Sequence, residues 1–302
     1  MLGVCLTPGI SYDRATAITD RVHGYPPMAE WMDSILATHA LRDTFVVNRH
    51  GEQQHLFYLP AASPTPRTAF IIHGYTNCAM GMMHIGYLYH HDLGYNIMLP
   101  DLRYHGESQG NHIQMGWHDR LDCERLLPVA DSLFGGNTRM VIHGISMGAA
   151  TTMMMSGDSL PPYVRCFVED CGYTSAWDEF QGELRNRYHL PPFPLLYTTS
   201  LYCKLRHGWS FGECSALRQV SKCTLPMLFI HGDRDTFVPT PMVYRLYQNK
   251  TGAKELWISP GSEHADSYTD HPETYTRTVA MFLGRYMKYG TLSALYRSQK
   301  AI

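Results

Sequence analysis

The chain has little charge and no long hydrophobic run, and both absences restrict what it can do. Charged residues make up 17% of its 302 residues, the net charge is −2, and no stretch is strongly basic. Nucleic-acid and polyanion binding therefore lack the positive field on which they depend. No apolar stretch approaches the roughly 18 residues that a membrane-spanning helix needs, so we expect no membrane span.

The eight cysteines lack the spacing of a metal or redox motif. No pair forms Cys-x-x-Cys, and His84, His90 and His91 do not form His-Glu-x-x-His. We therefore expect buried free thiols in preference to disulfides or a metal site. No motif calls for a metal or a cofactor.

The first six residues have neither a basic region nor a long apolar core, so they are not an intact signal peptide. Two compartments stay open. The protein is cytoplasmic if this N-terminus is native, and belongs to the cell envelope or is exported if an anchor or signal was removed. The oligomeric state is not indicated.

What is present fits a compact α/β protein. Hydrophobic residues make up 44% of the chain, which is typical of a globular domain. Three continuous apolar runs each end in His-Gly, and continuous runs indicate strands buried on both faces of a parallel sheet. These runs are residues 69–74, 140–144 and 227–232, with further candidate strands at 96–100, 164–168 and 255–258.

Segments of helical length separate these strands, at residues 80–92, 118–134, 241–249 and 272–289. A kink is expected at Pro128. Alternating strands and helices predict a doubly wound, mostly parallel sheet. Ligands bind such sheets beyond the carboxyl ends of the strands, which is the edge where the His-Gly pairs lie.

Two regions break this alternation. Residues 1–67 predict an N-terminal extension, with a helix over 28–40 and a hairpin of strands 43–48 and 54–59. Residues 174–222 form a long insertion rich in aromatic residues and proline, which we expect to be a cap over the active edge. The α/β core would then comprise residues 68–173 and 223–302.

A Gly-x-Ser-x-Gly segment, residues 144–148, joins an apolar run to a small-residue, methionine-rich run. This order predicts a strand, a tight turn that carries Ser146, and a helix. Such a turn holds the serine hydroxyl exposed to a base, and the helix aims backbone N–H groups at developing negative charge. The segment alone is too common to prove that Ser146 is a nucleophile. The residues that follow it in the chain must therefore supply the further evidence.

That setting supplies an acid and a base in the order Ser, Asp, His. Asp233 and Asp235 follow the strand at 227–232, and His264 follows the strand at 255–258. Both loops lie at the same predicted sheet edge as Ser146.

These motifs make the chain resemble the α/β-hydrolase superfamily from about Thr68 to Tyr286. It is similar in particular to bacterial serine hydrolases with an Asp-x-Arg-x-His-Gly-x-Ser segment, here residues 101–108. The resemblance implies that Asp235, which begins Asp-x-x-Val-Pro, is the triad acid. It further implies an oxyanion hole formed by the backbone N–H groups of Tyr75 and Met147.

The implied activity is hydrolysis of carboxylic esters through an acyl-enzyme on Ser146, with an apolar or aromatic acyl group. A peptidase or amidase of the same fold and a non-catalytic binding member are the alternatives. The small-molecule substrate would meet Trp117 and cap aromatics such as Phe180, Tyr188 and Trp209. The alternative is that Trp117 caps the following helix and that the aromatics form the cap's own core.

Overall fold

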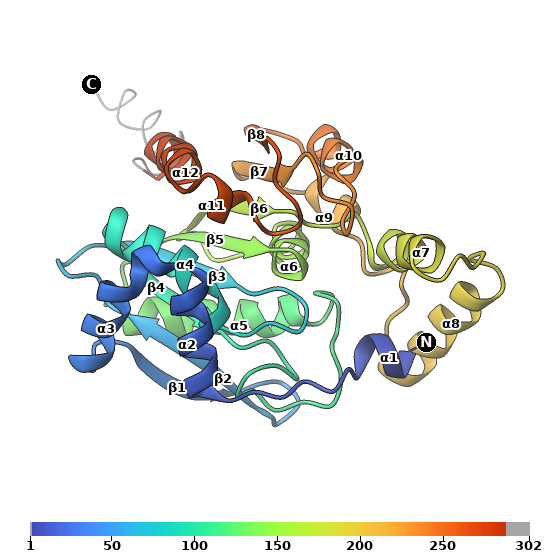
Figure 1. Ribbon diagram of the computed structural model, residues 1–302, viewed down its shortest axis with the longest axis horizontal. Coiled ribbons are helices and arrows are strands. Elements are labelled where there is room, and N and C mark those ends of the chain that lie inside the picture. The colour runs from blue at the N-terminus through green and yellow to red at the C-terminus, as the bar shows by residue number, and fades with distance from the viewer. Residues whose placement is uncertain (1, 288–302) are drawn as a thin grey trace, which may run out of the picture.

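The computed structural model describes residues 2–287 and contains one eight-stranded sheet (Figure 1). The strand order is β1-β2-β4-β3-β5-β6-β7-β8. The strands are β1 Arg42–Val47, β2 Gln53–Leu59, β3 Arg67–Ile72, β4 Asn96–Pro100, β5 Arg139–Ile145, β6 Val164–Asp170, β7 Met227–Gly232 and β8 Lys254–Ser259.

The six strands from β4 to β8 in this order run parallel, and β1 and β2 add an antiparallel edge next to β4. β4 and β7 are buried along their whole length, as their continuous apolar sequences predict for a sheet covered on both faces. The expected doubly wound, mostly parallel sheet is therefore confirmed.

Two hydrophobic clusters cover the two faces of the sheet. The first contains residues of α1 Leu2–Leu6, α5 Asp119–Leu133, α6 Met147–Met155, α7 Ala176–Asn186, α8 Leu195–His207, α9 Ala216–Val220 and α10 Pro241–Asn249. The second contains residues of α2 Arg14–Gly24, η1 Pro26–Met28, α3 Ala29–Ala37, η2 Met80–Met82, α4 Met83–Tyr87, η3 Leu88–Asp92, α11 Ser267–Asp270 and α12 Pro272–Tyr286.

The chain before β1 is spread over distant parts of the fold. α1 lies beside α7 and α8, whereas α2 and α3 lie on the other side of the molecule (Figure 1). The segment between β6 and β7 is divided as well. α7 and α8 extend away from the sheet, but Gln219 of α9 donates from Nε2 to the carbonyl of Met154 on α6, at 3.0 Å.

Several local expectations need correction. α2 was not predicted, because no residue in it is fully buried and its sequence carries a weak periodic signal. The expected helix at 80–92 is divided into η2, α4 and η3, whereas α5 continues through Pro128. The expected end of the last helix, at residue 289, falls outside the described residues.

Two further expectations concern the membrane and the cysteines. In the described part of the chain, no helix combines the length and the apolar character that crossing a bilayer demands. All eight cysteines are free thiols, and seven of them are buried.

Candidate active site

Ser146 occupies a sharp turn between β5 and α6. Its backbone has φ 58° and ψ −120°, a conformation that is unusual for a residue with a side chain. A Cβ on Gly144 would lie 2.1 Å from the carbonyl oxygen of Gly148, and a Cβ on Gly148 would lie 2.1 Å from that of Ile72. Both glycines are therefore required by backbone contacts that hold the serine in place.

The side chains of Ser146, His264 and Asp235 form a hydrogen-bonded chain. His264 Nε2 lies 2.8 Å from Ser146 Oγ, and His264 Nδ1 lies 2.7 Å from Asp235 Oδ2. These distances meet the geometric requirement for a nucleophile, a base and an orienting acid. The carboxyl ends of β5, β7 and β8 thus bring together three residues that are up to 118 positions apart.

Asp235 lies in a pocket of hydrogen-bond donors. Its Oδ1 accepts the backbone N–H groups of Phe237 at 3.0 Å and Val238 at 2.9 Å, and its Oδ2 faces both His264 and His231. Burial alone would raise the pKa of Asp235, but the hydrogen bonds from His231 and His264 outweigh it and hold this pKa at about 2. The carboxylate is therefore ionised at neutral pH.

Two backbone N–H groups are free to serve an oxyanion. Met147 is the first residue of α6, and within residues 2–287 neither its N–H nor that of Tyr75 has a hydrogen-bond partner. Both residues line the cavity that contains Ser146. A Cβ on Gly74 would lie 3.3 Å from Ser146 Cβ, so the loop that carries Tyr75 closely approaches the serine.

Buried side chains brace the loops around this centre. Asp101 accepts the backbone N–H of Ala79 at 2.7 Å and lies 2.7 Å from His55 Nδ1. His105 Nε2 accepts the backbone N–H of Thr76 at 3.2 Å, in the loop next to Tyr75. The segment 101–108 therefore positions the predicted oxyanion loop, and neither Asp101 nor His105 lines the cavity.

The histidines that end β3 and β7 also have structural partners. His73 Nε2 accepts the backbone N–H of Leu102 at 2.9 Å. His231 Nε2 lies 2.8 Å from the carbonyl oxygen of Val238. Each ring ties the end of a strand to a neighbouring loop at the carboxyl edge of the sheet.

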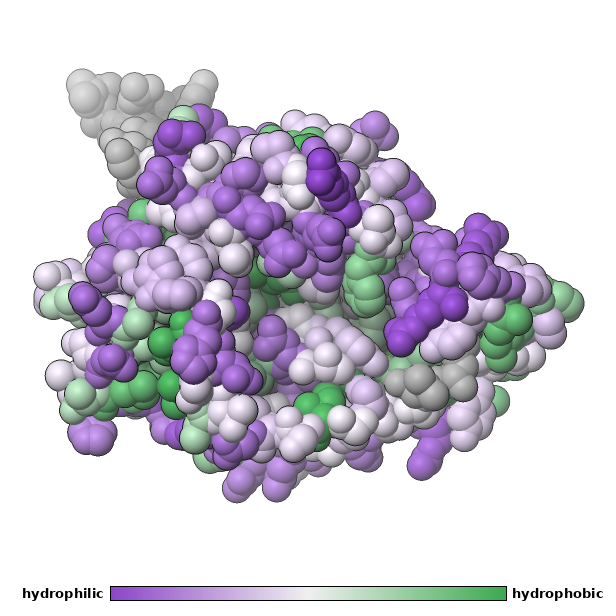
Figure 2. Space-filling view, in the orientation of Figure 1, coloured by the Kyte–Doolittle hydropathy of each residue, from purple (hydrophilic) through white to green (hydrophobic). Residues whose placement is uncertain are grey.

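A cavity of about 780 Å³ lies above Ser146, and Figure 2 shows a hollow with hydrophobic residues inside it near the start of α6. Phe180 and Tyr188 line the cavity as expected, but Trp117 and Trp209 do not. Trp117 lies under the guanidinium of Arg120, 3.7 Å away, and Trp209 is fully buried. These two tryptophans therefore lie outside the wall of this cavity, whereas Phe180 and Tyr188 belong to it.

Other cavity residues were not predicted. Glu179 and Leu184 of α7 line the cavity, Glu179 directly before Phe180 and Leu184 one helical turn after Phe180. The ring of Phe237 lies 4.9 Å from the ring of His264, centroid to centroid. The spacing of Phe180 and Leu184 on one helical face was a usable signal. Burial raises the pKa of Glu179 to about 8, so this carboxyl is mostly protonated at neutral pH.

A second buried carboxyl, Asp170 at the end of β6, lies behind the triad. Its Oδ2 accepts a hydrogen bond from Tyr275 at 3.0 Å, the Tyr275 hydroxyl lies 3.0 Å from His143 Nε2, and His143 Nδ1 faces the hydroxyl of Tyr89. Burial raises the pKa of Asp170 to about 6, although the bond from Tyr275 opposes the rise. This carboxyl makes no hydrogen bond to His264.

One group of potential metal ligands exists among the described residues, and it overlaps the triad. The ligand atoms of Cys171, Asp235 and His264 lie within 4.8 Å of one another. The two nitrogens of His264 already face Asp235 and Ser146, and burial raises the pKa of the Cys171 thiol well above its usual range. The donor set therefore fits a serine triad better than a metal centre.

Comparisons with known proteins agree with this geometry. The family model of the prolyl oligopeptidase family matches residues 103–290, more than half of the chain. The chain is 34% identical over 226 residues to the uncharacterized protein YqkD of Bacillus subtilis, covering 75% of this chain and 74% of YqkD. It is 26% identical to the uncharacterized protein YfhR of Escherichia coli K12 over 63% of this chain and 60% of YfhR.

Solved structures show the same fold. An esterase of Pyrococcus furiosus, Pf2001, superposes with a TM-score of 0.66 at 22% identity, covering 82% of this chain and 91% of that one. A puromycin-hydrolysing peptidase of Mycobacterium tuberculosis superposes with a TM-score of 0.61 at 17% identity, covering 82% of this chain and 39% of that one. The chain belongs to the prolyl oligopeptidase family, and is a serine hydrolase of the α/β-hydrolase superfamily.

Proposed function

We propose that the protein hydrolyses carboxylic esters with an apolar acyl group, through an acyl-enzyme on Ser146. The observation that carries this proposal is the cavity above the serine, which is walled by Phe180, Leu184 and other apolar side chains. Such a cavity accommodates an apolar group and excludes water from the reacting carbonyl. Of its two acidic residues, Glu179 is mostly neutral at pH 7, and Glu183 forms an ion pair with Arg187.

The proposed reaction has two acyl-transfer steps. His264 takes the proton of Ser146 as the hydroxyl oxygen attacks the ester carbonyl, and the ionised Asp235 stabilises the imidazolium. The N–H groups of Tyr75 and Met147 hold the oxyanion. The protonated His264 gives its proton to the departing alkoxide, and water then releases the acyl group by the same route.

The proposed roles of the chain segments follow from the same cavity. α7 and the loop after it supply its outer wall, so residues 174–222 would act as the cap, with α9 as the part joined to the core. Residues 1–67 would be an extension that contributes Cys5 of α1 to the cavity and the two antiparallel strands to the sheet.

Membership in the prolyl oligopeptidase family favours a peptidase or amidase as the second candidate. Esters and amides react through the same triad, so specificity depends on how the cavity holds the acyl and leaving groups. The cavity also contains Glu183 and Arg187, which lie 3.9 Å apart as an ion pair on α7. An unpaired charge for recognising a peptide end is absent from the described cavity wall.

Labelling with a fluorophosphonate tests the nucleophile. The wild-type protein should be labelled, and Ser146→Ala should not. Ser156→Ala is a matched control, because Ser156 follows the other end of α6 and is buried to the same degree. Equal labelling of Ser146→Ala would overturn the assignment.

Nitrophenyl esters of increasing chain length, compared with aminoacyl nitroanilides, test the substrate class. We expect a higher kcat/KM for medium-chain esters than for acetate, because each buried CH₂ contributes about 0.8 kcal/mol. Faster hydrolysis of the nitroanilides would favour the peptidase.

A further inference from the structure

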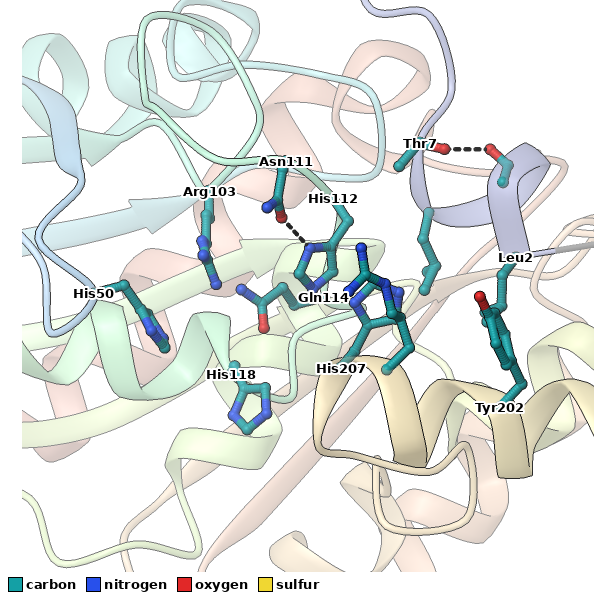
Figure 3. Close-up of a pocket in the computed structure, with 13 residues that line it drawn as sticks. Leu2, Thr7, His50, Arg103, Asn111, His112, Gln114, His118, Tyr202 and His207 are labelled. Carbon is teal, nitrogen blue, oxygen red and sulfur yellow. Dashed lines mark hydrogen bonds between the residues drawn. The ribbon is translucent and has the colours of Figure 1, made fainter.

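A second cavity, of about 520 Å³, lies on the opposite side of α1 from the active site. Leu2 and Leu6 of α1 face this cavity, whereas Cys5 faces the active-site cavity. The remaining walls come from the segment 111–118, from the end of α8, and from His50 and Arg103, as Figure 3 shows. The cavity therefore lies between the core and the proposed cap.

Its walls are rich in nitrogen and contain no carboxylate. The basic and titratable side chains that line it are His50, Arg103, His112, His118, Arg206 and His207. Arg103 forms an ion pair with Glu52 through both Nε, at 2.5 Å, and Nη2, at 2.6 Å, and its Nη1 has no hydrogen-bond partner among residues 2–287. Arg206 is exposed and has no ion-pair partner among residues 2–287.

A buried amide at this cavity has no partner. Gln114 is fully buried, and neither its Nε2 nor its Oε1 makes a hydrogen bond. Figure 3 shows this amide pointing into the space between Arg103, His118 and His112. Burying an unsatisfied amide costs free energy, so its orientation into a basic cavity indicates a missing polar occupant.

The histidines are held in an unfavourable environment for their charged forms. Burial together with the neighbouring His207 and Arg103 lowers the pKa of His112 to about 4. Burial together with Arg49 and Arg120 lowers the pKa of His118 to about 4. A negative charge in the cavity would offset this repulsion and raise both pKa values.

A metal cation does not fit the same residues. Within the described chain, no three histidine, cysteine or carboxylate ligand atoms converge at this cavity closely enough to share an ion. The rings of His112 and His207 lie with their centroids 4.0 Å apart and their planes tilted by 35°, and His112 Nδ1 is already engaged by the side chain of Asn111.

We propose that this cavity is a second binding site, for a small organic anion that carries a phosphate or carboxylate group. The anion would accept hydrogen bonds from the Gln114 amide, Nη1 of Arg103 and the exposed guanidinium of Arg206. Leu2, Leu6 and the ring of Tyr202 provide an apolar wall for its organic part. This site is separate from the proposed ester-binding cavity, so it stands or falls independently of the proposed activity.

Isothermal titration of the full chain with inorganic phosphate tests the site directly. We expect saturable binding with a Kd on the order of 1 mM or below. Phenyl phosphate should bind more tightly than phosphate, because its ring contacts the apolar wall. Benzoate in a parallel titration decides between the two headgroups, since tighter binding of benzoate than of phenyl phosphate assigns the site to carboxylates.

Protonation provides a signature that non-specific binding to the surface lacks. Because the anion raises the pKa of His112 and His118, binding should take up protons, seen as a heat that depends on the ionisation enthalpy of the buffer. The affinity for benzoate, whose own charge does not change in this range, should also increase as the pH falls from 8 to 6. The charged and titratable groups that face these two rings are Arg49, His50, Glu52, Arg103, Asp119, Arg120, Asp122, Arg206 and His207.

Two variants separate binding from folding. Arg206→Gln should weaken phosphate binding about tenfold, since it removes one charged donor. Arg277→Gln is the matched control, because Arg277 on α12 is also exposed and has no ion-pair partner within the described chain. Gln114→Leu should abolish binding yet raise the Tm of the unliganded protein by about 2 to 4 °C, because it removes an unsatisfied amide.

Two results would overturn the proposal. The first is the absence of saturable binding of any of the three anions to the wild-type protein at millimolar concentration. The second is phosphate binding by Arg206→Gln and Gln114→Leu that equals binding by Arg277→Gln, since the anion would then bind elsewhere.

Discussion

The two cavities on either side of α1 use opposite chemistry. The active-site cavity is walled by apolar side chains, and every charged group in it is either paired or neutralised by burial. The second cavity is walled by histidine, arginine and amide groups, and the amide of Gln114 and Nδ1 of His118 have no hydrogen-bond partner among the described residues. Each cavity contains a buried polar group without a partner in the described chain, Glu179 Oε2 in the first and the Gln114 amide in the second, but the unpartnered amide of the second cavity is surrounded by basic side chains.

The two cavities also differ in what holds them. In the active site, the strand ends and the strained turn at Ser146 fix the reacting groups before any ligand arrives. In the basic cavity, donors come from α8 and from the turn between β1 and β2 as well as from the loop 111–118. A reaction centre requires groups that are fixed in place before the ligand binds, as they are around Ser146. Such preorganisation is less important for a site that only binds a ligand.

The largest effect is expected from removing the negative charge of Asp235 in the active site. Asp235→Asn should lower kcat about 10³- to 10⁴-fold, because the amide cannot hold His264 in the required tautomer. Asp170→Asn is the matched control, since its oxygen can still accept from Tyr275 and it does not bond His264. Steady-state kinetics with a nitrophenyl ester measures both. A comparable loss in the two variants would show that Asp235 has no special role.

The next effect concerns the buried carboxyl in the apolar cavity. The pKa of Glu179 is raised from 4.5 to about 8 in the folded protein, so the unfolded chain loses this proton first as the pH rises. The free energy of unfolding should therefore fall between about pH 5 and pH 8, by roughly 1.4 kcal/mol per pH unit. In Glu179→Gln, the free energy of unfolding measured with urea should not show this part of the decline with pH. Identical pH profiles for the variant and the wild-type protein would contradict the raised pKa of Glu179.

A smaller effect distinguishes the walls of the two cavities. Tyr188 lines the active-site cavity and Tyr202 lines the basic cavity, and both rings are about half exposed. Tyr188→Ala should lower kcat/KM for a medium-chain ester about tenfold relative to acetate, as expected for lost apolar contact. Tyr202→Ala should leave that ratio unchanged. A shift of the ratio by both variants would mean that the cavities are not separate for substrate.

The smallest effect lies on the outer face of α8, which belongs to neither cavity. Leu205 is 78% exposed, and Figure 2 shows hydrophobic residues at the surface at this end of the molecule. Leu205→Ser should change the free energy of unfolding by no more than about 0.5 kcal/mol and leave ester hydrolysis unaltered. A large change in either quantity would show that this face has a partner within the fold.

Much of the fold could be predicted because buried parallel strands have a distinctive sequence. The runs that became β5 and β7 are continuous and apolar, and their ends position Ser146 and Asp235 on one edge. The order of nucleophile, acid and base therefore placed the triad residues in loops that the structure brings together. α2 gave no such signal, because its residues cover other helices only in part.

The basic cavity could not be predicted, for a physical reason. His50, Gln114 and His207 come from segments with no shared pattern, and only the packing of α8 against the loop 111–118 makes them neighbours. That Trp117 and Trp209 lie outside the wall of the active-site cavity could not be predicted for a related reason. Composition marks Trp209 as an aromatic of the proposed cap, but only the packing shows that it is fully buried away from the cavity.

α8 connects the two cavities mechanically. Its thirteen residues span about 20 Å, with Leu195 at one end lining the active-site cavity and His207 at the other lining the basic cavity. A ligand that shifts α8 when it binds in one cavity changes the affinity of the other cavity for its ligand. Thermodynamic linkage makes such a change reciprocal. Whatever factor phosphate imposes on the Kd of an unreactive ester analogue, the analogue must impose on the Kd of phosphate.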